Sequence, residues 1–557
     1  MPSLFDVAWT ANRWIGSSPE LYSILKRLYD RVRGAPDIEL RHILEGSPAP
    51  DWPEPTKGRV LFFSPRYWPE QVSWQLIVAY ALRAEGYQPE FVSCGGAAQV
   101  CDAYAAEMTP GGFCRYCDRS LQRLLAPTGF NHRQLADFID TDRVREEARA
   151  ALAPLDLDGC RAFELDGIPI GRLIEPTVAR SLRQVAFEPD ALTTELYRGF
   201  LETAWLNVRA LEPILAEPWE FVVMLNGKFV AESMLLHLAS ERGLDYVTYE
   251  RGFRVDTLFF AVNDQVTDFD VSRHFAAIRD IELTGEQDAQ LQQYEAQRRV
   301  GQQAIIQYFP EIDDDRPAIT NEFGIDTRRR IAVCFPNIVW DTAVFGHERA
   351  FDSIWDWVRC TIESYLESPD WSLILRIHPA EVRLPHKTRE SMQTMIEQHF
   401  GELPDHIHLI PADSKASSYV FLELAERVLV YSSTMGLEAA MQGKDVVTAA
   451  RTHYAELGFT RDAFDADSYR ELLGAPIGLD ADPVREQSRR YANLFFHRFQ
   501  IPVKSVKEER LSQPRYRFSS LGDLLSGRYP EVEFVRRGLL PLENGARLLP
   551  EDLTSVA

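Results

Sequence analysis

RVLVYSSTMGLEAAMQGKDVVTAARTHY, residues 427–454, is the stretch around which we expect this chain to be built. Its first part predicts a buried strand over residues 428–431, followed by a hydroxyl-rich turn of Ser432, Ser433 and Thr434. A helix then follows, ends at Gly443 and gives way to the strand VVTAA. Strand, helix and strand with short joints are typical of a parallel α/β sheet.

The turn in this stretch has the chemistry of a phosphate site. A helix that begins at the carboxyl end of a strand points several backbone N–H groups at one place, which suits a phosphate. Thr434 and Glu438 are four residues apart and share a helix face, so the carboxylate could accept ribose hydroxyls beside that phosphate. Any αβ unit begins with a similar cap, so this stretch alone leaves a nucleotide site and an ordinary helix start as alternatives.

Length and composition describe a globular protein of two domains. The 557 residues exceed what one core supports, and the hydrophobic content of 45% is ordinary for a folded protein. The net charge of −23 argues against binding to nucleic acid or to an anionic membrane. With neither a signal peptide nor a transmembrane segment in the sequence, we expect a cytoplasmic protein, with peripheral membrane association left open.

The alternation of strands and helices predicts two Rossmann-like lobes in tandem. We expect a helical extension and linker over 1–57, a first lobe over 58–310 with a cysteine-rich insertion at 94–130, a second lobe over 320–484, and a helical or irregular tail over 485–557. This α/β arrangement, two Rossmann-type lobes facing across a cleft, places ligands beyond the carboxyl ends of the strands.

Polar side chains gather in the strand-ending loops of the second lobe. Besides the serine turn, these loops supply Asn337, Trp340 and Asp341 in FPNIVWD, His378, Pro379 and Glu381 in RIHPAE, and His453 and Tyr454 in THY. Several such loops at one sheet edge predict a ligand site. His378 is either a structural imidazole or a donor to a phosphate oxygen, and Trp340 either stacks on a base or covers the core.

RIHPAE, YSSTMGLEAAMQGKDVV and THY together resemble the C-terminal lobe of bacterial capsule polysaccharide biosynthesis proteins, including Kdo-transferase-like glycosyltransferases. The likeness extends upstream to FPNIVWD and, more weakly, to NGK (226–228) and YERG (249–252), and so covers roughly residues 58–500. It implies a glycosyltransferase of the GT-B type, which moves a sugar from a nucleotide-sugar donor to a capsule or other cell-surface glycan precursor, either a glycan or a lipid-linked glycan.

The same resemblance assigns roles to residues. His378 corresponds to a histidine that contacts the donor phosphate, Ser432, Ser433 and Thr434 to the phosphate turn, and Glu438 to a carboxylate on the ribose or sugar. The second lobe would hold the donor and the first lobe the acceptor. No catalytic metal is expected, because enzymes of this type stabilise the departing phosphate with N–H groups and a histidine.

The acceptor side needs a base if the transfer inverts the sugar. The candidates are Glu250, Glu232 and Glu70, with Asn226 and Arg251 beside them. Glu250 is preferred, since Arg251 follows it directly in the loop. Two other functions stay open at this point: a sugar-nucleotide epimerase of the same two-lobed fold, and a non-catalytic nucleotide- or glycan-binding assembly protein.

Four of the seven cysteines lie within 24 residues, at Cys94, Cys101, Cys114 and Cys117. Four thiolates this close can form a structural zinc site that stabilises a long loop. The last two have the Cys-x-x-Cys spacing of a zinc knuckle, whereas the first two are further apart than usual. Unliganded thiols and an iron–sulfur cluster are the alternatives to zinc.

Overall fold

The structure is a computed structural model. It describes residues 36–46, 48, 50–103, 110–111, 113–184, 187, 189–268, 270–303, 309, 311–341, 344–383, 388–510 and 513–553. The chain divides into two compact units. Unit 1 comprises Met1–Leu182, Glu188–Phe269 and Arg498–Ala557, and unit 2 comprises Arg183–Phe187 and Asp270–His497.

Unit 1 is built on an eight-stranded sheet in the order β13-β6-β5-β4-β1-β2-β3, with β16 also paired to β6. The five strands from β3 to β5 are mutually parallel, and β6 runs antiparallel to β5. The strands of the unit are β1 Arg59–Phe63, β2 Gln88–Ser93, β3 Asn131–Gln134, β4 Phe221–Leu225, β5 Tyr246–Arg251, β6 Thr257–Val262, β13 Ile501–Pro502, β14 Val506–Arg510, β15 Gln513–Tyr516 and β16 Gly545–Ala546.

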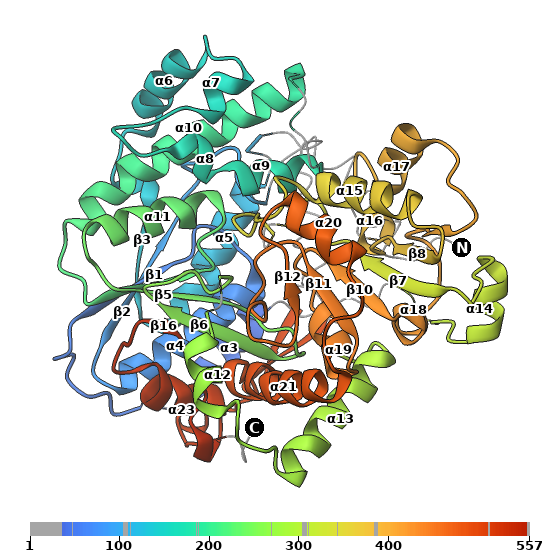
Figure 1. The fold of residues 1–557 in the computed structure, drawn as a ribbon. Coiled ribbons are helices and arrows are strands. Elements are labelled where there is room, and N and C mark those ends of the chain that lie inside the picture. The colour runs from blue at the N-terminus through green and yellow to red at the C-terminus, as the bar shows by residue number, and fades with distance from the viewer. Residues whose placement is uncertain are drawn as a thin grey trace. The chain divides into compact units, whose positions relative to one another are not determined.

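Helices cover both faces of this sheet, with α10 and α11 on one side and α4 and α23 on the other (Figure 1). The longest of them, α10, begins where the Asp190 carboxylate accepts the Thr193 N–H, and α4 begins with Pro69 in its first turn. The helices are α3 Pro36–Glu45, α4 Pro69–Ala84, α5 Cys114–Leu125, α6 Thr141–Leu152, α7 Leu157–Arg161, α8 Ile170–Leu173, α9 Glu175–Leu182, α10 Ala191–Leu215, α11 Val230–Glu241, α22 Leu521–Leu524 and α23 Pro530–Phe534.

Unit 2 contains a fully parallel six-stranded sheet in the order β12-β11-β10-β7-β8-β9. Its strands are β7 Arg330–Phe335, β8 Trp371–Arg376, β9 Ile407–Ile410, β10 Arg427–Val430, β11 Asp445–Thr448 and β12 Arg461–Asp462. The helices are α12 Ser272–Ile278, α13 Gly285–Arg299, α14 Arg316–Glu322, α15 Ile354–Leu366, α16 Ala380–Arg383, α17 Met392–Phe400, α18 Ser418–Leu424, α19 Met435–Met441, α20 Ala466–Gly474 and α21 Ala481–Leu494.

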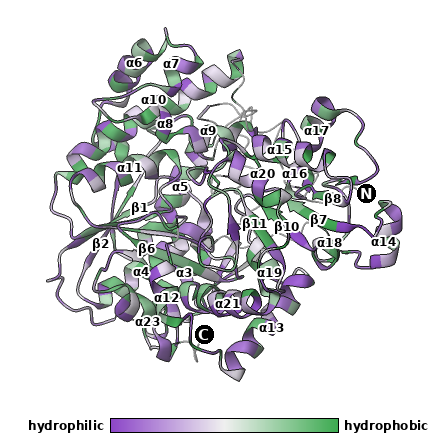
Figure 2. Cartoon of the chain, viewed as in Figure 1, coloured by the Kyte–Doolittle hydropathy of each residue, from purple (hydrophilic) through white to green (hydrophobic). Residues whose placement is uncertain are grey.

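Hydrophobic residues dominate the central strands of both sheets (Figure 2), whereas the edge strands β3 and β12 are polar. Every residue of β4, β10 and β11 is buried, because helices cover a parallel sheet on both faces. The expectation of an α/β protein with two parallel sheets is therefore confirmed. The strand, turn and helix predicted for residues 428–443 are β10, Ser432–Thr434 and α19.

The C-terminal tail differs from the helical or irregular segment expected for 485–557. Its residues from Arg498 onward belong to unit 1, where β13 and β16 pair with β6 and β14 forms a hairpin with β15. The free edge of β6 explains this, since an unpaired strand edge binds any extended segment that reaches it. β13 and β16 have two residues each, too few for a recognisable sequence pattern.

One other boundary also differs from that expected. Residues 270–303, placed with the first lobe from the sequence, pack as α12 and α13 within unit 2, where α13 contacts α21. Arg489 of α21 forms ion pairs with Asp288 and Glu295 of α13, which a polar helix read alone does not reveal. Within the expected N-terminal extension, residues 1–35 lie outside the described part, and α3 is the described helix.

Candidate functional site

The carboxyl edge of the unit 2 sheet has a topological switch point between β7 and β10. β7 pairs with β8 on one side and with β10 on the other, so the connections that follow β7 and β10 leave in opposite directions. Asn337 follows β7 and Ser432 follows β10, and the Ser432 N–H donates to Asn337 Oδ1 at 3.2 Å. The structure thus joins two of the predicted polar loops where open α/β sheets bind ligands.

The turn after β10 holds its own backbone in place. The Ser433 hydroxyl accepts the Met435 N–H at 3.3 Å, and the Ser433 carbonyl accepts the Gly436 N–H at 3.1 Å. Thr434 stands at the N-cap of α19, and its side chain makes no capping hydrogen bond. Ser432, Ser433 and Thr434 are all partly exposed, so their polar groups can meet a ligand.

Glu438 lies one turn further along α19 and is buried. Its carboxylate accepts the Arg298 Nε–H at 3.1 Å and the Tyr419 hydroxyl at 2.6 Å. The structure therefore places Glu438 within an ion pair next to the turn. A carboxylate oxygen can accept more than one hydrogen bond, so these contacts leave room for a ligand hydroxyl.

His378 follows β8, and its hydrogen bond and lowered pKa define its tautomer and its protonation state. Its Nδ1 accepts the Ala380 N–H at 3.1 Å, which puts the proton of the neutral ring on Nε2. Burial lowers the His378 pKa to about 4, helped by the positive charges of Arg376 and Arg298. At neutral pH this imidazole is an uncharged N–H donor.

The other residues predicted for the loops after β7 and β8 make hydrogen bonds within those loops. Pro379 precedes α16, and the buried Glu381 accepts the Met392 N–H at 3.1 Å at the start of α17. Burial raises the Glu381 pKa to about 7. Trp340 donates to the Thr388 hydroxyl at 2.9 Å, and the Asp341 backbone closes a turn with Ile338 and Val344.

His453 and Tyr454 follow β11, and Tyr454 contacts the Ser432–Thr434 turn. The His453 ring stacks on Phe495 with 3.9 Å between ring centroids, and its Nδ1 lies 2.7 Å from the Tyr491 hydroxyl. Burial lowers the His453 pKa to about 3. The buried Tyr454 hydroxyl donates to the Ser433 carbonyl, and a Cβ at Gly436 would meet that hydroxyl. Tyr454 thus positions the turn through its backbone.

The corresponding switch point of unit 1, between β1 and β4, is filled by ion pairs. Arg66 follows β1 and forms a bidentate pair with Glu232, with both N···O distances 2.9 Å. Asp102 approaches the same guanidinium at 3.2 Å. Arg66 is 5% exposed and Glu232 is 1% exposed, so the predicted base Glu232 is held inside a buried ion pair.

The other first-lobe candidates meet at the end of β5. The Asn226 amide donates to Glu250 Oε2 at 2.6 Å, and Glu250 Oε1 accepts the Arg251 N–H at 2.7 Å. Arg251 lies 3.9 Å from Glu70, which is buried in the first turn of α4. Glu250, partly exposed and oriented by two donors, is the best placed of the three predicted bases.

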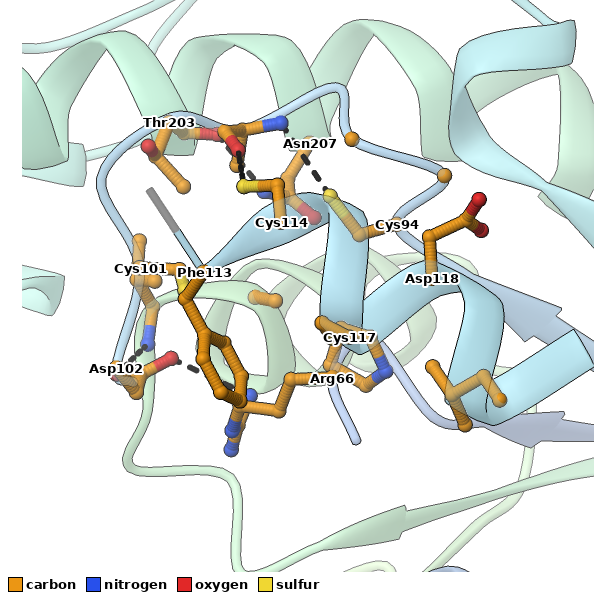
Figure 3. Close-up of a pocket in the computed structure, with 17 residues that line it drawn as sticks. Arg66, Cys94, Cys101, Asp102, Phe113, Cys114, Cys117, Asp118, Thr203 and Asn207 are labelled. Atoms are coloured by element: carbon orange, nitrogen blue, oxygen red, sulfur yellow. Dashed lines mark hydrogen bonds and ion pairs between the residues drawn. The ribbon is translucent and has the colours of Figure 1, made fainter. Parts of the chain in front are cut away.

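The four predicted metal-ligating cysteines line one cavity, together with Arg66, Asp102 and Phe113 (Figure 3). Burial raises the pKa of Cys114 to about 11 and of Cys117 to about 12, so both thiols are neutral at pH 7. Throughout the residues that the structure describes, no group of three or more His, Cys, Asp or Glu side chains has an arrangement that could hold a metal ion. The zinc site predicted from the sequence is thus not present as a preformed single-ion site.

Sequence reasoning missed four residues of these two edges: Arg66, Asp102, Arg298 and Tyr419. Arg66 had a usable signal, because it follows a buried strand in FFSPR at a ligand-facing edge. Arg298 and Tyr419 had none, since each is far from Glu438 in the sequence and only the fold brings them together.

Comparison with protein families matches residues 287–475 to the family described as capsule polysaccharide biosynthesis protein. This range contains every donor-side residue predicted above. The resemblance expected from RIHPAE and YSSTMG is confirmed for this part of unit 2. Comparison with curated proteins gives no match.

Solved structures give distant likenesses. The beta Kdo 2,4 transferase of Thermosulfurimonas dismutans KpsC is 15% identical, with 55% of this chain and 87% of that chain covered and a TM-score of 0.32. The beta Kdo 2,7 transferase of the same protein is 13% identical, with coverages of 57% and 89% and a TM-score of 0.32. UDP-GlcNAc 2-epimerase from Neisseria meningitidis, bound to UDP-GlcNAc, is 11% identical, with coverages of 77% and 94% and a TM-score of 0.28.

None of the described helices combines the length and the apolar character needed to cross a bilayer.

Proposed function

We propose that this protein is a cytoplasmic glycosyltransferase of the GT-B type that moves a sugar from a nucleotide-activated donor to a capsule or other cell-surface glycan precursor. The observation that carries this proposal is the β7/β10 switch point, where Asn337 meets the Ser432–Thr434 turn within the range that matches the capsule family. Unit 2 would hold the donor and unit 1 the acceptor.

On the donor side, Ser432, Ser433 and Thr434 would bind the donor phosphates through hydroxyl and N–H groups. The neutral His378 would donate its Nε2–H to a phosphate oxygen and so stabilise the charge that develops as the nucleotide departs. Glu438 would accept a ribose or sugar hydroxyl beside its bonds to Arg298 and Tyr419.

On the acceptor side, Glu250 would take the proton of the attacking hydroxyl. Its orientation by Asn226 and Arg251 supports this role, because a general base needs a fixed lone pair directed at the substrate. Glu232 is a poorer base, since its charge is already matched by Arg66.

The first experiment measures consumption of a panel of nucleotide sugars with and without capsule glycan acceptors. A transferase consumes the donor and forms a new glycosidic linkage only when acceptor is present. Isomerisation of the donor without acceptor would identify an epimerase instead, and nucleotide binding without turnover would identify an assembly protein.

The second experiment tests the residues. Glu250→Gln should lower kcat by about 100-fold or more, the usual contribution of a general base, while nucleotide binding is retained. The matched control is Glu241→Gln on α11, whose exposed carboxylate pairs with His237. Equal rates for Glu250→Gln and the control would remove Glu250 from the mechanism. His378→Gln and Ser433→Ala should instead weaken nucleotide binding.

A further inference from the structure

A cleft of about 490 Å³ opens at the carboxyl edge of the unit 1 sheet. The loop between β5 and β6, the segment after β13 and the β14–β15 hairpin contribute to its walls. β5 is parallel to β4 and ends at Arg251, and Thr257 at the start of β6 pairs with Pro502 at the end of β13. The cleft therefore lies at the sheet edge where α/β proteins bind ligands.

Positive charge is concentrated in this cleft. Its lining contains one acidic side chain, Asp256, and five basic side chains, although the whole chain has 83 acidic and 60 basic residues. The five are Arg254, Lys504, Lys507, Arg517 and Arg528. In a chain with a net charge of −23, such a local excess of positive charge favours an anion that the rest of the surface repels.

Lys507 and Arg517 stand on one face of the β14–β15 hairpin. The Arg517 N–H donates to the Ser505 carbonyl at 2.7 Å, which extends the antiparallel ladder by one pair. Residues two apart on a strand share a face, so Lys507 lies on the same face as Ser505 and its partner Arg517. Lys507 and Arg517 are then diagonal neighbours, about 7–8 Å apart, and their like charges repel each other.

These two cations lack a counter-charge within the part of the chain that the structure describes. Both side chains are exposed, and neither the Lys507 ammonium nor the Arg517 guanidinium makes a hydrogen bond or an ion pair with a described residue. An anion between them would remove their repulsion and gain two charge-assisted hydrogen bonds.

Tyr529 brings a third cation to the same place. The Tyr529 hydroxyl donates to the Arg517 carbonyl at 3.0 Å and accepts a hydrogen bond from Arg528. Asp523 pairs with Arg528 at 3.2 Å. Both of these contacts use Nη2 of Arg528, so Nη1 and Nε can donate to a ligand in the cleft.

The backbone on the other side of the cleft is held by hydrogen bonds. The Arg254 N–H donates to Gln500 Oε1 at 2.6 Å, and the Val503 N–H donates to the Asp256 carbonyl at 2.8 Å. The buried Glu531 carboxylate accepts two backbone N–H groups of the segment before β14, at 3.0 and 2.7 Å. The walls are thus fixed without a ligand, which lowers the entropic cost of binding one.

We propose that this cleft of unit 1 binds a phosphate monoester. A phosphate dianion matches the combined charge of Lys507 and Arg517, and its oxygens can accept the paired N–H groups of an arginine. The volume lies within the range of roughly 300–1,000 Å³ typical of small-molecule sites, so there is also space for the organic group that carries the phosphate. The site goes beyond the proposed transfer reaction, because none of its residues has a role there and binding is measured without turnover.

The test is calorimetric titration of the full-length protein with inorganic phosphate and with glycerol 3-phosphate. The double variant Lys507→Gln/Arg517→Gln should raise the Kd by about 10-fold or more. The matched control is Lys57→Gln/Arg143→Gln, which removes one lysine and one arginine from exposed ion pairs elsewhere in unit 1 and should keep the wild-type Kd. Arg528→Gln, a separate substitution in the cleft, should also raise the Kd and keeps the test decisive if the double variant unfolds.

The two double variants also separate this site from the serine turn of unit 2, for which we propose phosphate binding as well. Wild-type protein that binds neither probe would overturn the cleft site. Equal Kd values in the cleft variants and the control would overturn it too, and would leave phosphate binding to unit 2, so the two proposals fail in different ways.

Flotation with phosphatidylcholine vesicles, with and without phosphatidic acid, identifies the source of the phosphate. We expect a soluble ester, because the net charge of −23 opposes approach to an anionic bilayer. Binding of glycerol 3-phosphate without recruitment to the vesicles would support that source. Recruitment by phosphatidic acid that the cleft variants lose and the control keeps would support the same phosphate site with a lipid headgroup as its ligand.

Discussion

The switch points of the two sheets share a topology and differ in what fills them. In unit 2 the loops after β7 and β10 meet through one neutral hydrogen bond, between Asn337 and the Ser432 N–H, and both residues stay partly exposed. In unit 1 the loops after β1 and β4 meet at Arg66, which is buried with Glu232 and Asp102. Topology alone therefore offers a ligand position, and the side chains decide whether a ligand can use it.

The free-energy cost of leaving buried charges unpaired explains this difference between the two units. Opening the unit 1 switch point would leave ionised groups buried without partners, which costs several kcal/mol. Rearranging the unit 2 loops breaks only neutral bonds that water can replace. The partly exposed polar groups of this edge of unit 1 that we propose face a substrate lie one strand further along, at Glu250 and Arg251, the last two residues of β5.

The largest effect is expected for Arg66→Met. Loss of the guanidinium leaves Glu232 and Asp102 buried without a counter-charge, so the free energy of unfolding of unit 1 should fall by about 3–5 kcal/mol. Hydrogen exchange of the β1 and β4 amides, followed by mass spectrometry, measures this locally.

The control is Arg143→Met on α6, where an exposed pair with Glu147 is lost. That pair should contribute only about 0.5 kcal/mol or less. If the two variants lose the same stability, the unit 1 switch point is not held by its charges, and the contrast between the units fails.

The second-largest effect is expected for the pH dependence of the stability of unit 2. His453 has a pKa of about 3 in the folded protein and about 6.5 when unfolded, so the unfolded chain binds a proton that the folded chain does not. Stability therefore rises with pH across this interval, and the His453 contribution is about 2 kcal/mol lower at pH 5 than at pH 7.

His453→Gln should make the fall in stability between pH 7 and pH 5 smaller by that amount, as measured by urea unfolding at both values. His399→Gln, which changes an exposed ring on α17, is the control and should keep the wild-type pH dependence. A variant at His453 with an unchanged pH dependence would mean that the ring is not buried in its neutral form.

Sequence reasoning predicted the fold and the polar loops at one edge of the unit 2 sheet because both rest on local patterns. Buried strands, short turns and helix starts are visible in RVLVYSSTMGLEAA, and sheet topology then puts Asn337, His378 and Ser432 at one edge. Ion pairs between residues far apart in the sequence could not be predicted. Arg66 with Glu232, and Arg298 with Glu438, are 166 and 140 residues apart, and nothing local indicates such pairs.

The same limit explains why the strands of the tail and the arrangement of the four cysteines were not predicted from the sequence. β13 and β16 become strands only because β6 offers them an edge, so their own two residues carry no pattern. The spacing of Cys94, Cys101, Cys114 and Cys117 indicated a shared site, and the structure brings them to one cavity. What spacing could not supply is the distance between the sulfurs, which depends on how the loop after β2 packs against α5.

A smaller effect is expected for Tyr454→Phe, which removes the hydroxyl bonded to the Ser433 carbonyl. A hydrogen bond of this kind contributes about 0.5–1.5 kcal/mol, so a loosened turn should weaken nucleotide-sugar binding by up to about 10-fold. Tyr469→Phe is the control, because its buried hydroxyl bonds Trp357 and Thr361 away from the turn. Calorimetry should give the control a wild-type Kd; equal Kd values for both variants would show that Tyr454 supports the core and not the turn.

The smallest effect on stability is expected for Asn337→Ala, the unit 2 counterpart of Arg66→Met. Only one neutral acceptor is lost, and water can reach the Ser432 N–H, so the free energy of unfolding should fall by less than about 1 kcal/mol. Asn337→Asp keeps an acceptor oxygen at this position but adds a negative charge, and so should retain stability while it weakens binding of an anionic donor. Thermal unfolding and nucleotide titration separate these outcomes. A loss from Asn337→Ala as large as that from Arg66→Met would mean that both switch points are held equally firmly, and that the difference between the two units lies elsewhere.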